Sequence, residues 1–410
     1  MSNFISTLQN RGFIYQATNL EELEKKVSGN KIKAYIGFDC TAKSLHVGSL
    51  IQIMMLRWLQ KFGHQPIILL GGGTTKIGDP SGKDEARKML GYNDIEENKK
   101  SLKKVFNQFL NFDSENKAII LDNDEWLSEL QYLEFLRDFG KHFSINRMIN
   151  FESVKMRLDR EQSLSFLEFN YMLLQAFDFY HLYKEQECIL QMGGSDQWGN
   201  IINGVELIRK KLGDEVFGLT SPLLTTNSGA KMGKTESGAV WLNDDMLSSY
   251  EYWQFWRNTE DADVVKFLKL FTELPLDEID KLSKLTGKEI NNTKIILADE
   301  ATKLCHGIEA SINAKITSQK TFEDNSIGDN LPKFNITLND ISGGFPLFKL
   351  LVSSGLCESN GAARKLIQGN GVRINNAIIN DINYMIQQSD FNDNKMKLST
   401  GKKKHMLVQF

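Results

Sequence analysis

Residues 35–49 read YIGFDCTAKSLHVGS, which is the sharpest local signal in the chain. An apolar run at residues 32–38 has the length of a buried strand, and an amphipathic helical pattern begins near His46. Amide groups at a helix start, together with the positive end of the helix dipole, attract phosphate. Gly48 permits close approach of a nucleotide, and His46 can donate hydrogen bonds to phosphoryl oxygens. The stretch therefore predicts a phosphate site, although a lone His beside Gly is often purely structural.

The same alternation of strand and helix continues outward from this stretch. Short apolar runs bounded by turn residues recur at residues 67–70, 118–121 and 188–192. Stretches with helical spacing, such as residues 50–62 and 166–179, lie between or beside them. Alternating strands and helices indicate an α/β fold with a parallel sheet covered on both faces, which binds ligands beyond the carboxyl ends of its strands.

The length of 410 residues predicts two or three domains. We expect a catalytic α/β domain at residues 1–245. Glycine then becomes scarce and helix-spaced apolar residues dominate, which indicates an α-helical domain at residues 246–325. Residues 326–344 are expected to be a linker. A small α/β domain is expected at residues 345–410.

Charge is distributed unevenly along the chain. The net charge is −3, yet residues 331–410 hold ten Lys and Arg against five Asp and Glu. This asymmetry favours a basic module attached to an acidic body, with lysines merely scattered over a solvated surface as the alternative.

The composition also limits the compartment and the kind of site. The four cysteines are far apart and lack the spacing of metal ligands or of a disulfide framework. No run approaches 18 consecutive apolar residues, and the start of the chain has no signal-peptide pattern. We therefore expect a cytoplasmic protein with no protein-bound metal and no membrane partner.

A second motif, KMGKT at residues 231–235, lies in a loop opened by NSGA at residues 227–230. Lys231, Lys234 and Thr235 are suited to stabilising charge on a leaving pyrophosphate, and such a loop could close around ATP. Taken alone, the motif is equally compatible with a lysine-bearing surface loop. Its combination with HVGS, in this order, is far more specific.

The helical stretch EFNYMLLQAFD at residues 168–178 carries a polar face. Tyr171, Gln175 and Asp178 stand at i, i+4 and i+7 and so share that face. A phenol, an amide and a carboxylate together can hold the ammonium group of an amino acid and a hydroxyl. The alternative is a solvated polar stripe, although the many neighbouring aromatic residues make it less attractive.

Two more segments follow predicted strands. In QMGGSDQWGN at residues 191–200, Asp196 and Gln197 could bind a ribose diol or a polar group of the substrate. GGGTTKIGDPSGK at residues 71–83 lacks the glycine spacing of a P-loop, but its Asp79 is a candidate partner for an α-ammonium group.

HVGS and KMGKT resemble the two signatures of the class I aminoacyl-tRNA synthetases. With the segments at 168–178 and 191–200, the chain resembles the tyrosyl-tRNA synthetases of bacteria over essentially its whole length. The resemblance implies a Rossmann-like catalytic domain, an anticodon-side role in tRNA binding for the α-helical domain, and activation of L-tyrosine by ATP before transfer to the 3′ end of tRNA(Tyr). It also implies a homodimer and Mg²⁺ arriving with ATP.

The resemblance assigns roles residue by residue. The tyrosine-binding positions are Tyr35 and Asp178 at the hydroxyl, Asp79, Tyr171 and Gln175 at the ammonium group, and Gln191 near the carboxylate. The catalytic positions are Thr41, His46, Ser49, Lys231, Lys234 and Thr235. The positions that shape the ATP and adenylate site are Gly37, Asp39, His46, Gly48, Gly194, Asp196, Gln197 and Lys234. Ser49 replaces a His found in some members, and the loop has Lys-Met-Gly where many class I enzymes have Lys-Met-Ser.

The last part of the chain resembles an S4-type RNA-binding module. LLVSSGL at residues 350–356 and AARKLIQG at 362–369 suit two short helices, which lead into VRINN at 372–376. Arg364 and Lys365 fall in the second helix and suit contacts with RNA phosphates. A basic but inert tail domain is the alternative.

Two rival functions come from other classes. One is a nucleotidyltransferase of the same fold with a different acceptor, including the tryptophanyl enzyme, against which Tyr35 and the face of residues 171–178 argue. The other is a noncatalytic RNA-binding protein that kept the fold, against which intact HVGS and KMGKT argue.

The second motif generates a kinetic prediction. Lys234→Ala should lower the rate of adenylate formation by roughly one to three powers of ten, because the lysine is expected to act mainly on charge in the transition state. Tyrosine binding should change much less. Single-turnover kinetics measures both, and an unchanged rate would remove Lys234 from the mechanism.

Overall fold

The computed structural model describes residues 3–80, 90–225, 227, 232–235, 238–322, 331–337, 340–341, 343–401 and 404–410. The chain forms two compact units. The first comprises Met1–Leu247 and Asn258–Cys305, and the second comprises Ser248–Arg257 and His306–Phe410. The chain thus leaves the first unit and re-enters it before the second is complete.

The first unit is built on a six-stranded sheet with the order β1-β6-β5-β2-β3-β4. The strands are β1 (Gln16–Ala17), β2 (Lys33–Asp39), β3 (Gln65–Gly71), β4 (Ile119–Asp122), β5 (Cys188–Gly194) and β6 (Phe217–Ser221). All pairings are parallel except that of β1 with β6. The order reverses between β2 and β5, so the sheet has a topological switch point there.

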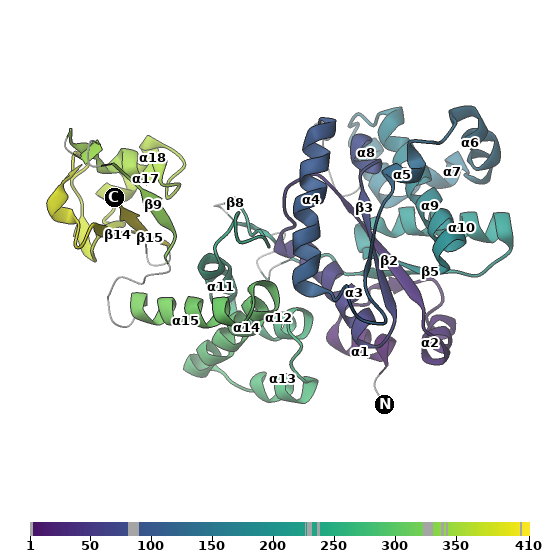
Figure 1. Cartoon of the computed structure of the whole chain (residues 1–410), viewed down its shortest axis with the longest axis horizontal. Coiled ribbons are helices and arrows are strands. Elements are labelled where there is room, and N and C mark those ends of the chain that lie inside the picture. The colour runs from purple at the N-terminus through teal and green to yellow at the C-terminus, as the bar shows by residue number, and fades with distance from the viewer. Residues whose placement is uncertain are drawn as a thin grey trace. The chain divides into compact units, whose positions relative to one another are not determined.

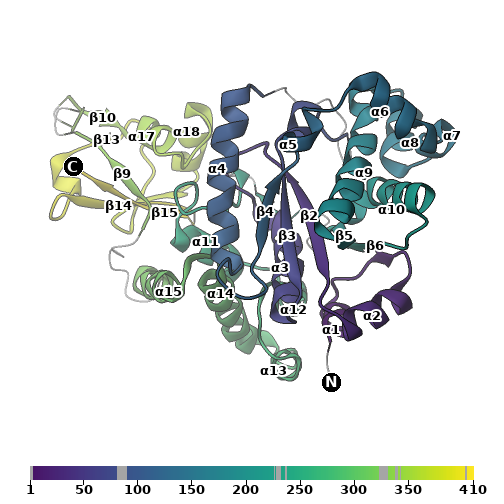
Figure 2. The ribbon, with the colours of Figure 1, turned by 45° about the vertical axis from the view of Figure 1, so that its right-hand side comes forward.

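Helices cover both faces of this sheet, with α3 and α4 on one face and α9 and α10 on the other (Figures 1 and 2). The helices of this unit are α1 (Phe4–Arg11), α2 (Leu20–Gly29), α3 (Leu50–Lys61), α4 (Tyr92–Phe109), α5 (Asp124–Leu127), α6 (Tyr132–Asp138), α7 (Ile145–Met148), α8 (Glu152–Asp159), α9 (Phe166–Gln186), α10 (Trp198–Leu212), α12 (Val264–Phe271), α13 (Leu276–Leu282) and α14 (Ile290–His306).

Local sequence explains where the two helices nearest the switch point begin. Ser165 caps α9 by accepting a hydrogen bond from the Glu168 amide, while the Glu168 carboxylate accepts from the Ser165 amide. This reciprocal capping box satisfies two amides that a helix start otherwise leaves unpaired. On the other face, the short 3₁₀ turn η1 (Val47–Ser49) leads directly into α3.

The α/β, Rossmann-like fold class expected from the sequence is confirmed. The apolar runs at 32–38, 67–70, 118–121 and 188–192 correspond to β2, β3, β4 and β5. The largely apolar character of these strands follows from helices lying on both faces of a parallel sheet.

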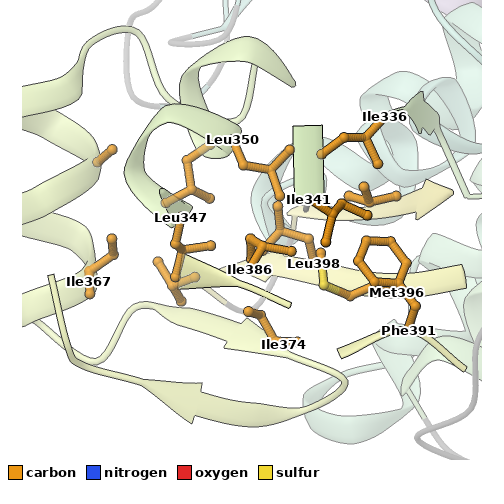
Figure 3. Close-up of a cluster of buried hydrophobic side chains, with 14 residues drawn as sticks. Ile336, Ile341, Leu347, Leu350, Ile367, Ile374, Ile386, Phe391, Met396 and Leu398 are labelled. Carbon is orange, nitrogen blue, oxygen red and sulfur yellow. The ribbon is translucent and has the colours of Figure 1, made fainter. Parts of the chain in front are cut away.

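The second unit contains a five-stranded sheet with the order β12-β11-β14-β15-β9. Its strands are β9 (Lys333–Asn335), β11 (Val372–Ile374), β12 (Ala377–Ile379), β14 (Lys395–Thr400) and β15 (Lys404–Gln409), and β10 (Phe345–Pro346) pairs separately with β13 (Met385–Ile386). Its helices are α11 (Ser249–Arg257), α15 (Ile308–Phe322), α17 (Leu347–Ser353) and α18 (Asn360–Gln368). Figure 3 shows the core between α17, α18 and the sheet, with Leu347, Leu350, Ile367, Ile374 and Leu398 pointing into it.

One strand lies inside the segment that we expected to be a linker. β9 falls within residues 326–344 and pairs in parallel with β15, and Ile336 just beyond it is buried in the C-terminal core. The predicted helical character of residues 246–325 agrees with α11 to α15, but α11 and α15 belong to the second unit and α12 to α14 to the first. The domain boundaries themselves stay a prediction.

Two further observations concern binding to membranes and metals. No helix in the described part of the chain is long and apolar enough to cross a membrane. Among the same residues, no group of three or more His, Cys, Asp or Glu side chains could hold a metal ion.

The C-terminal core generates a stability prediction. Leu350→Ala should lower the free energy of unfolding of this module by about 2–5 kcal/mol, because the side chain is fully buried and its loss leaves a cavity. Ile378→Ala is the matched control, since Ile378 lies on β12 of the same module with half its surface exposed. Urea denaturation of the full chain should show a small change for the control, and equal losses for both variants would contradict the packing shown in Figure 3.

Candidate active site

A cavity of about 670 Å³ lies at the switch point, where β2 and β5 end and α3 begins. Most of the side chains and glycines singled out in the sequence line it. They are Tyr35, Gly37, Asp39, Thr41, His46, Gly48, Ser49, Asp79, Tyr171, Gln175, Asp178, Gln191, Gly194, Asp196 and Gln197. The structure therefore brings together residues that are more than 150 positions apart in the sequence.

The remaining predicted residues belong to the second motif and to the second unit. Lys231 lies outside the described residues. Lys234 and Thr235 form strand β7, which pairs with β8 (Gly238–Ala239). Arg364 and Lys365 are exposed on α18 of the second unit.

A buried carboxylate lies at one side of the cavity. Asp178 is 2% exposed, and its two oxygens accept hydrogen bonds from Asn123 Nδ2 at 2.9 Å and Trp126 Nε1 at 2.7 Å. Burial raises the pKa of Asp178 to about 7, although both donors favour the ionised form.

A buried phenol shares this region. The Tyr35 hydroxyl has no hydrogen-bond partner within the described part of the chain. Burial, and then the charge of Asp178, raise the pKa of Tyr35 well above its usual value. A buried hydroxyl without a partner is costly, so this corner is suited to a polar group of a ligand.

A second carboxylate, Asp39, is connected to the first. Asp39 accepts hydrogen bonds from the Tyr171 hydroxyl at 3.1 Å and from Thr74 Oγ1 at 3.0 Å. Thr74 Oγ1 in turn accepts one from Asn123 Nδ2 at 3.0 Å. The Asn123 amide thus donates directly to Asp178 and also to Thr74, which in turn donates to Asp39.

Sequence reasoning missed Asn123, Trp126 and Thr74 as functional residues. Asn123 and Trp126 lie in DNDEW at residues 122–126, at the end of β4. Polar residues directly after a buried parallel strand were the available signal, because such positions face the ligand side of the sheet.

A cluster of amides surrounds the third carboxylate. Asp79 is buried and accepts a hydrogen bond from Gln197 Nε2 at 2.8 Å. Asn200 Nδ2 donates to the Oε1 atoms of both Gln197 and Gln175, each at 3.0 Å. Nearby, Gln191 Oε1 is buried with no partner among the described residues.

The first motif occupies the start of η1 and α3. The Gly48 amide donates to His46 Nδ1 at 3.0 Å, which places the proton of the neutral imidazole on Nε2 and makes that atom a donor. A side chain at Gly48 would lie 2.6 Å from His46 Cε1, so glycine is required for this close approach.

Backbone hydrogen bonds tie the two motifs together. The Val47 amide donates to the Val240 carbonyl at 2.9 Å, and the Val240 amide donates to the Gly233 carbonyl at 3.0 Å. Gly233 has a φ of +97°, a conformation that glycine adopts without strain. Directly before Gly233, the Met232 amide donates to the Leu224 carbonyl at 3.0 Å. Val240 and Trp241 are therefore held beside His46 and Val47.

Comparison with known protein families gives two matches. The family model described as tRNA synthetases class I (W and Y) matches residues 27–323, and one described as the tyrosine–tRNA ligase SYY-like C-terminal domain matches residues 323–408. The two matches meet at residue 323 and together span nearly the whole chain.

Individual relatives with high sequence identity to this chain are also known. The tyrosine–tRNA ligase of Bartonella henselae is 57% identical over 410 residues, which is 100% of this chain and 98% of the relative. That of Zymomonas mobilis is 58% identical over 409 residues, with the same coverage. A solved structure of a C-terminally truncated mitochondrial tyrosyl-tRNA synthetase from Aspergillus nidulans has a TM-score of 0.71 at 31% identity and covers 78% of this chain and 95% of its own.

The buried carboxylate generates a prediction about pH. The Asp178 pKa is about 7 in the folded chain against an ordinary 3.8, so between these values the folded state keeps a proton that the unfolded state releases. Wild-type stability should therefore fall as pH rises, by about 1 kcal/mol per pH unit between about pH 5 and 7. Asp178→Asn removes this slope, so its free energy of unfolding relative to wild type should rise over that window.

Urea denaturation at several pH values measures the difference. Asp113→Asn, at an exposed position in the loop after α4, is the control and should show no such trend. A difference between Asp178→Asn and wild type that does not change with pH would contradict the raised pKa of Asp178.

Proposed function

This chain belongs to the tyrosine–tRNA ligases among the class I tRNA synthetases, and from that premise we propose a role for each part of its cavity. It activates L-tyrosine with ATP and transfers the tyrosine to tRNA(Tyr). The observation that carries the assignment of the cavity is the buried pair of Tyr35, whose hydroxyl lacks a partner among the described residues, and Asp178.

We propose that this pair binds the hydroxyl of the substrate. Asp178 already accepts two hydrogen bonds and, when ionised, can accept a third from the phenol O–H. The Tyr35 hydroxyl would gain the partner that it otherwise lacks. A tryptophan side chain has no hydroxyl to place here, which supports tyrosine rather than tryptophan as the substrate.

The other end of the amino acid would lie toward the amide cluster. Asp79, Tyr171 and Gln175 are proposed to bind the ammonium group. Gln191 would lie near the carboxylate, to which its Nε2 group can donate a hydrogen bond. These residues line the same cavity as Asp178, so one bound tyrosine can contact both ends.

ATP would bind where the two motifs meet. His46, Gly48 and Ser49, with Thr41, are proposed to contact the phosphates at the start of η1 and α3. The ribose and adenylate would be bound by Gly37, Asp39, Gly194, Asp196 and Gln197, all of which line the cavity. Lys231, Lys234 and Thr235 would act from the loop of the second motif. Mg²⁺ would enter with ATP and neutralise phosphate charge.

The proposed chemistry needs no protein nucleophile. A carboxylate oxygen of tyrosine attacks the α-phosphorus of ATP, the new C–O–P linkage forms, and the bond to pyrophosphate breaks. A ribose hydroxyl at the 3′ end of the tRNA then attacks the adenylate carbonyl and AMP leaves. The protein would accelerate both steps by positioning the reactants and stabilising charge.

The basic module is proposed to bind tRNA. Arg364 and Lys365 are exposed on α18, and the Arg364 guanidinium lies 4.2 Å from the centre of the Phe348 ring. Stacking on an aromatic ring orders the guanidinium, which suits a contact with phosphate. The helices of residues 246–325 would lie on the anticodon side of the same tRNA.

We further propose a cytoplasmic homodimer. Large apolar side chains are exposed between α6 and the start of α9, and they suit a self-complementary interface. They are Tyr132, Leu133, Ile145, Ile149, Leu158, Phe166 and Leu167.

The hydroxyl assignment can be tested with two amino acids. Asp178→Ala should lower tyrosine activation by roughly one to two powers of ten and change phenylalanine activation much less, because only tyrosine loses a charged hydrogen-bond partner. Tyr35→Phe should act in the same direction by roughly two- to tenfold, since it removes a neutral partner. Pyrophosphate exchange with each amino acid measures both effects. Full discrimination retained by Asp178→Ala would show that Asp178 does not read the hydroxyl.

A further inference from the structure

Asn200 belongs to the amide cluster, but it lies behind the two glutamines that line the cavity. It belongs to the first turn of α10, is 4% exposed, and does not itself line the cavity. Its single NH₂ group donates to two acceptors, Gln197 Oε1 and Gln175 Oε1. Both glutamines line the cavity, whereas Asn200 does not. Asn200 therefore contacts two residues that are proposed to bind the substrate, without lining the cavity itself.

The donor at Asn200 determines how the Gln197 amide is oriented. A carboxylate accepts hydrogen bonds and cannot donate them, so Gln197 must present its NH₂ group to Asp79. This leaves Gln197 Oε1 facing away from Asp79, where it needs a donor because the region is largely buried. Asn200 Nδ2 supplies that donor at 3.0 Å.

The same NH₂ group constrains Gln175. Because Gln175 Oε1 accepts from Asn200, the plane of the Gln175 amide is held relative to α10. Gln175 is on α9 and Gln197 precedes α10, so the Asn200 amide joins two elements at the place where the ammonium group is expected.

We propose that Asn200 is a positioning residue for the α-ammonium group of the amino-acid substrate. It acts through Gln197, which keeps the Asp79 carboxylate hydrogen-bonded and oriented, and through Gln175. This inference rests on the proposed assignment of Asp79 and Gln175 to the ammonium group.

Asn200→Asp is the sharpest variant because it preserves size and removes the donor. Both glutamines would have to turn their NH₂ groups toward the new carboxylate. Gln197 Oε1 would then face the Asp79 carboxylate, and this repulsion would displace the group that binds the ammonium. Asn200→Ala removes the donor without adding charge and should have a milder effect of the same kind.

Asn203→Ala provides a matched control on the same helix. Asn203 is 5% exposed, lies one turn further along α10, and its Nδ2 has no partner among the residues that the structure describes. It therefore reports the effect of removing a buried asparagine from α10 without changing the amide cluster. Thermal unfolding of each full-length variant shows that it is folded.

The test compares two ligands that differ only in the ammonium group, L-tyrosine and 3-(4-hydroxyphenyl)propanoate. Titration calorimetry should show that Asn200→Asp weakens tyrosine binding roughly ten- to hundredfold and Asn200→Ala roughly five- to tenfold. Binding of the analogue should change by less than about twofold in both variants, and Asn203→Ala should leave both ligands nearly unaffected. Equal losses for the two ligands would overturn the inference, because they would indicate a general structural role.

Asp79→Ala separates this inference from the proposed function. If wild type prefers tyrosine over the analogue and Asp79→Ala removes that preference, the ammonium site is sound and the Asn200 variants decide the inference alone. If wild type shows no preference, or Asp79→Ala keeps it, the ammonium assignment itself is wrong and the inference falls with it.

Discussion

The reversal of strand order between β2 and β5 is the constraint on which the cavity depends. Two parallel neighbours whose connecting helices run to opposite faces leave the space beyond their carboxyl ends uncovered. β2 delivers Tyr35 and Asp39 to that space, and β5 delivers Gln191 and Gly194. Helices α3 and α9 reach it from opposite faces with the turn η1, which we propose binds phosphate, and with the polar face that ends at Asp178. No other point along the sheet brings these four elements together.

Within this space, the buried Asn123 amide connects the carboxylates of Asp178 and Asp39. Asn123 donates to Asp178 and to Thr74, and Thr74 donates to Asp39. The charge of Asp39 is among the causes that raise the pKa of Asp178, although burial is the larger cause. Asn123 and Thr74 link the two carboxylates through neutral groups, and the hydrogen bond from Asn123 lowers the pKa of Asp178 less than burial raises it.

The sequence predicted the sheet and most of the cavity because those residues belong to local patterns, such as an apolar run before a glycine-rich turn or three polar residues on one helical face. It missed Asn123, Trp126 and Asn200 in their supporting roles because each acts through another side chain, and that contact exists only after folding. It also missed β9, since three residues show no period and their partner strand, β15, lies about seventy residues further on. The separation of α11 and α15 from α12 to α14 likewise depends on tertiary packing alone.

The backbone hydrogen bonds at Met232, Gly233 and Val240 have a consequence for the groups that we propose the second motif supplies beside His46. A tether of only a few residues between two fixed ends confines whatever it carries to a small volume, and the entropy lost on closing such a short loop is modest. Effective concentration is the relevant quantity here, because groups on a short tether act on a neighbouring site as if dissolved at millimolar levels or above. Lys234 and Thr235 directly follow one of these fixed points, and Gly238 and Ala239 directly precede the other, so the contribution of these residues depends little on how far the rest of the chain moves.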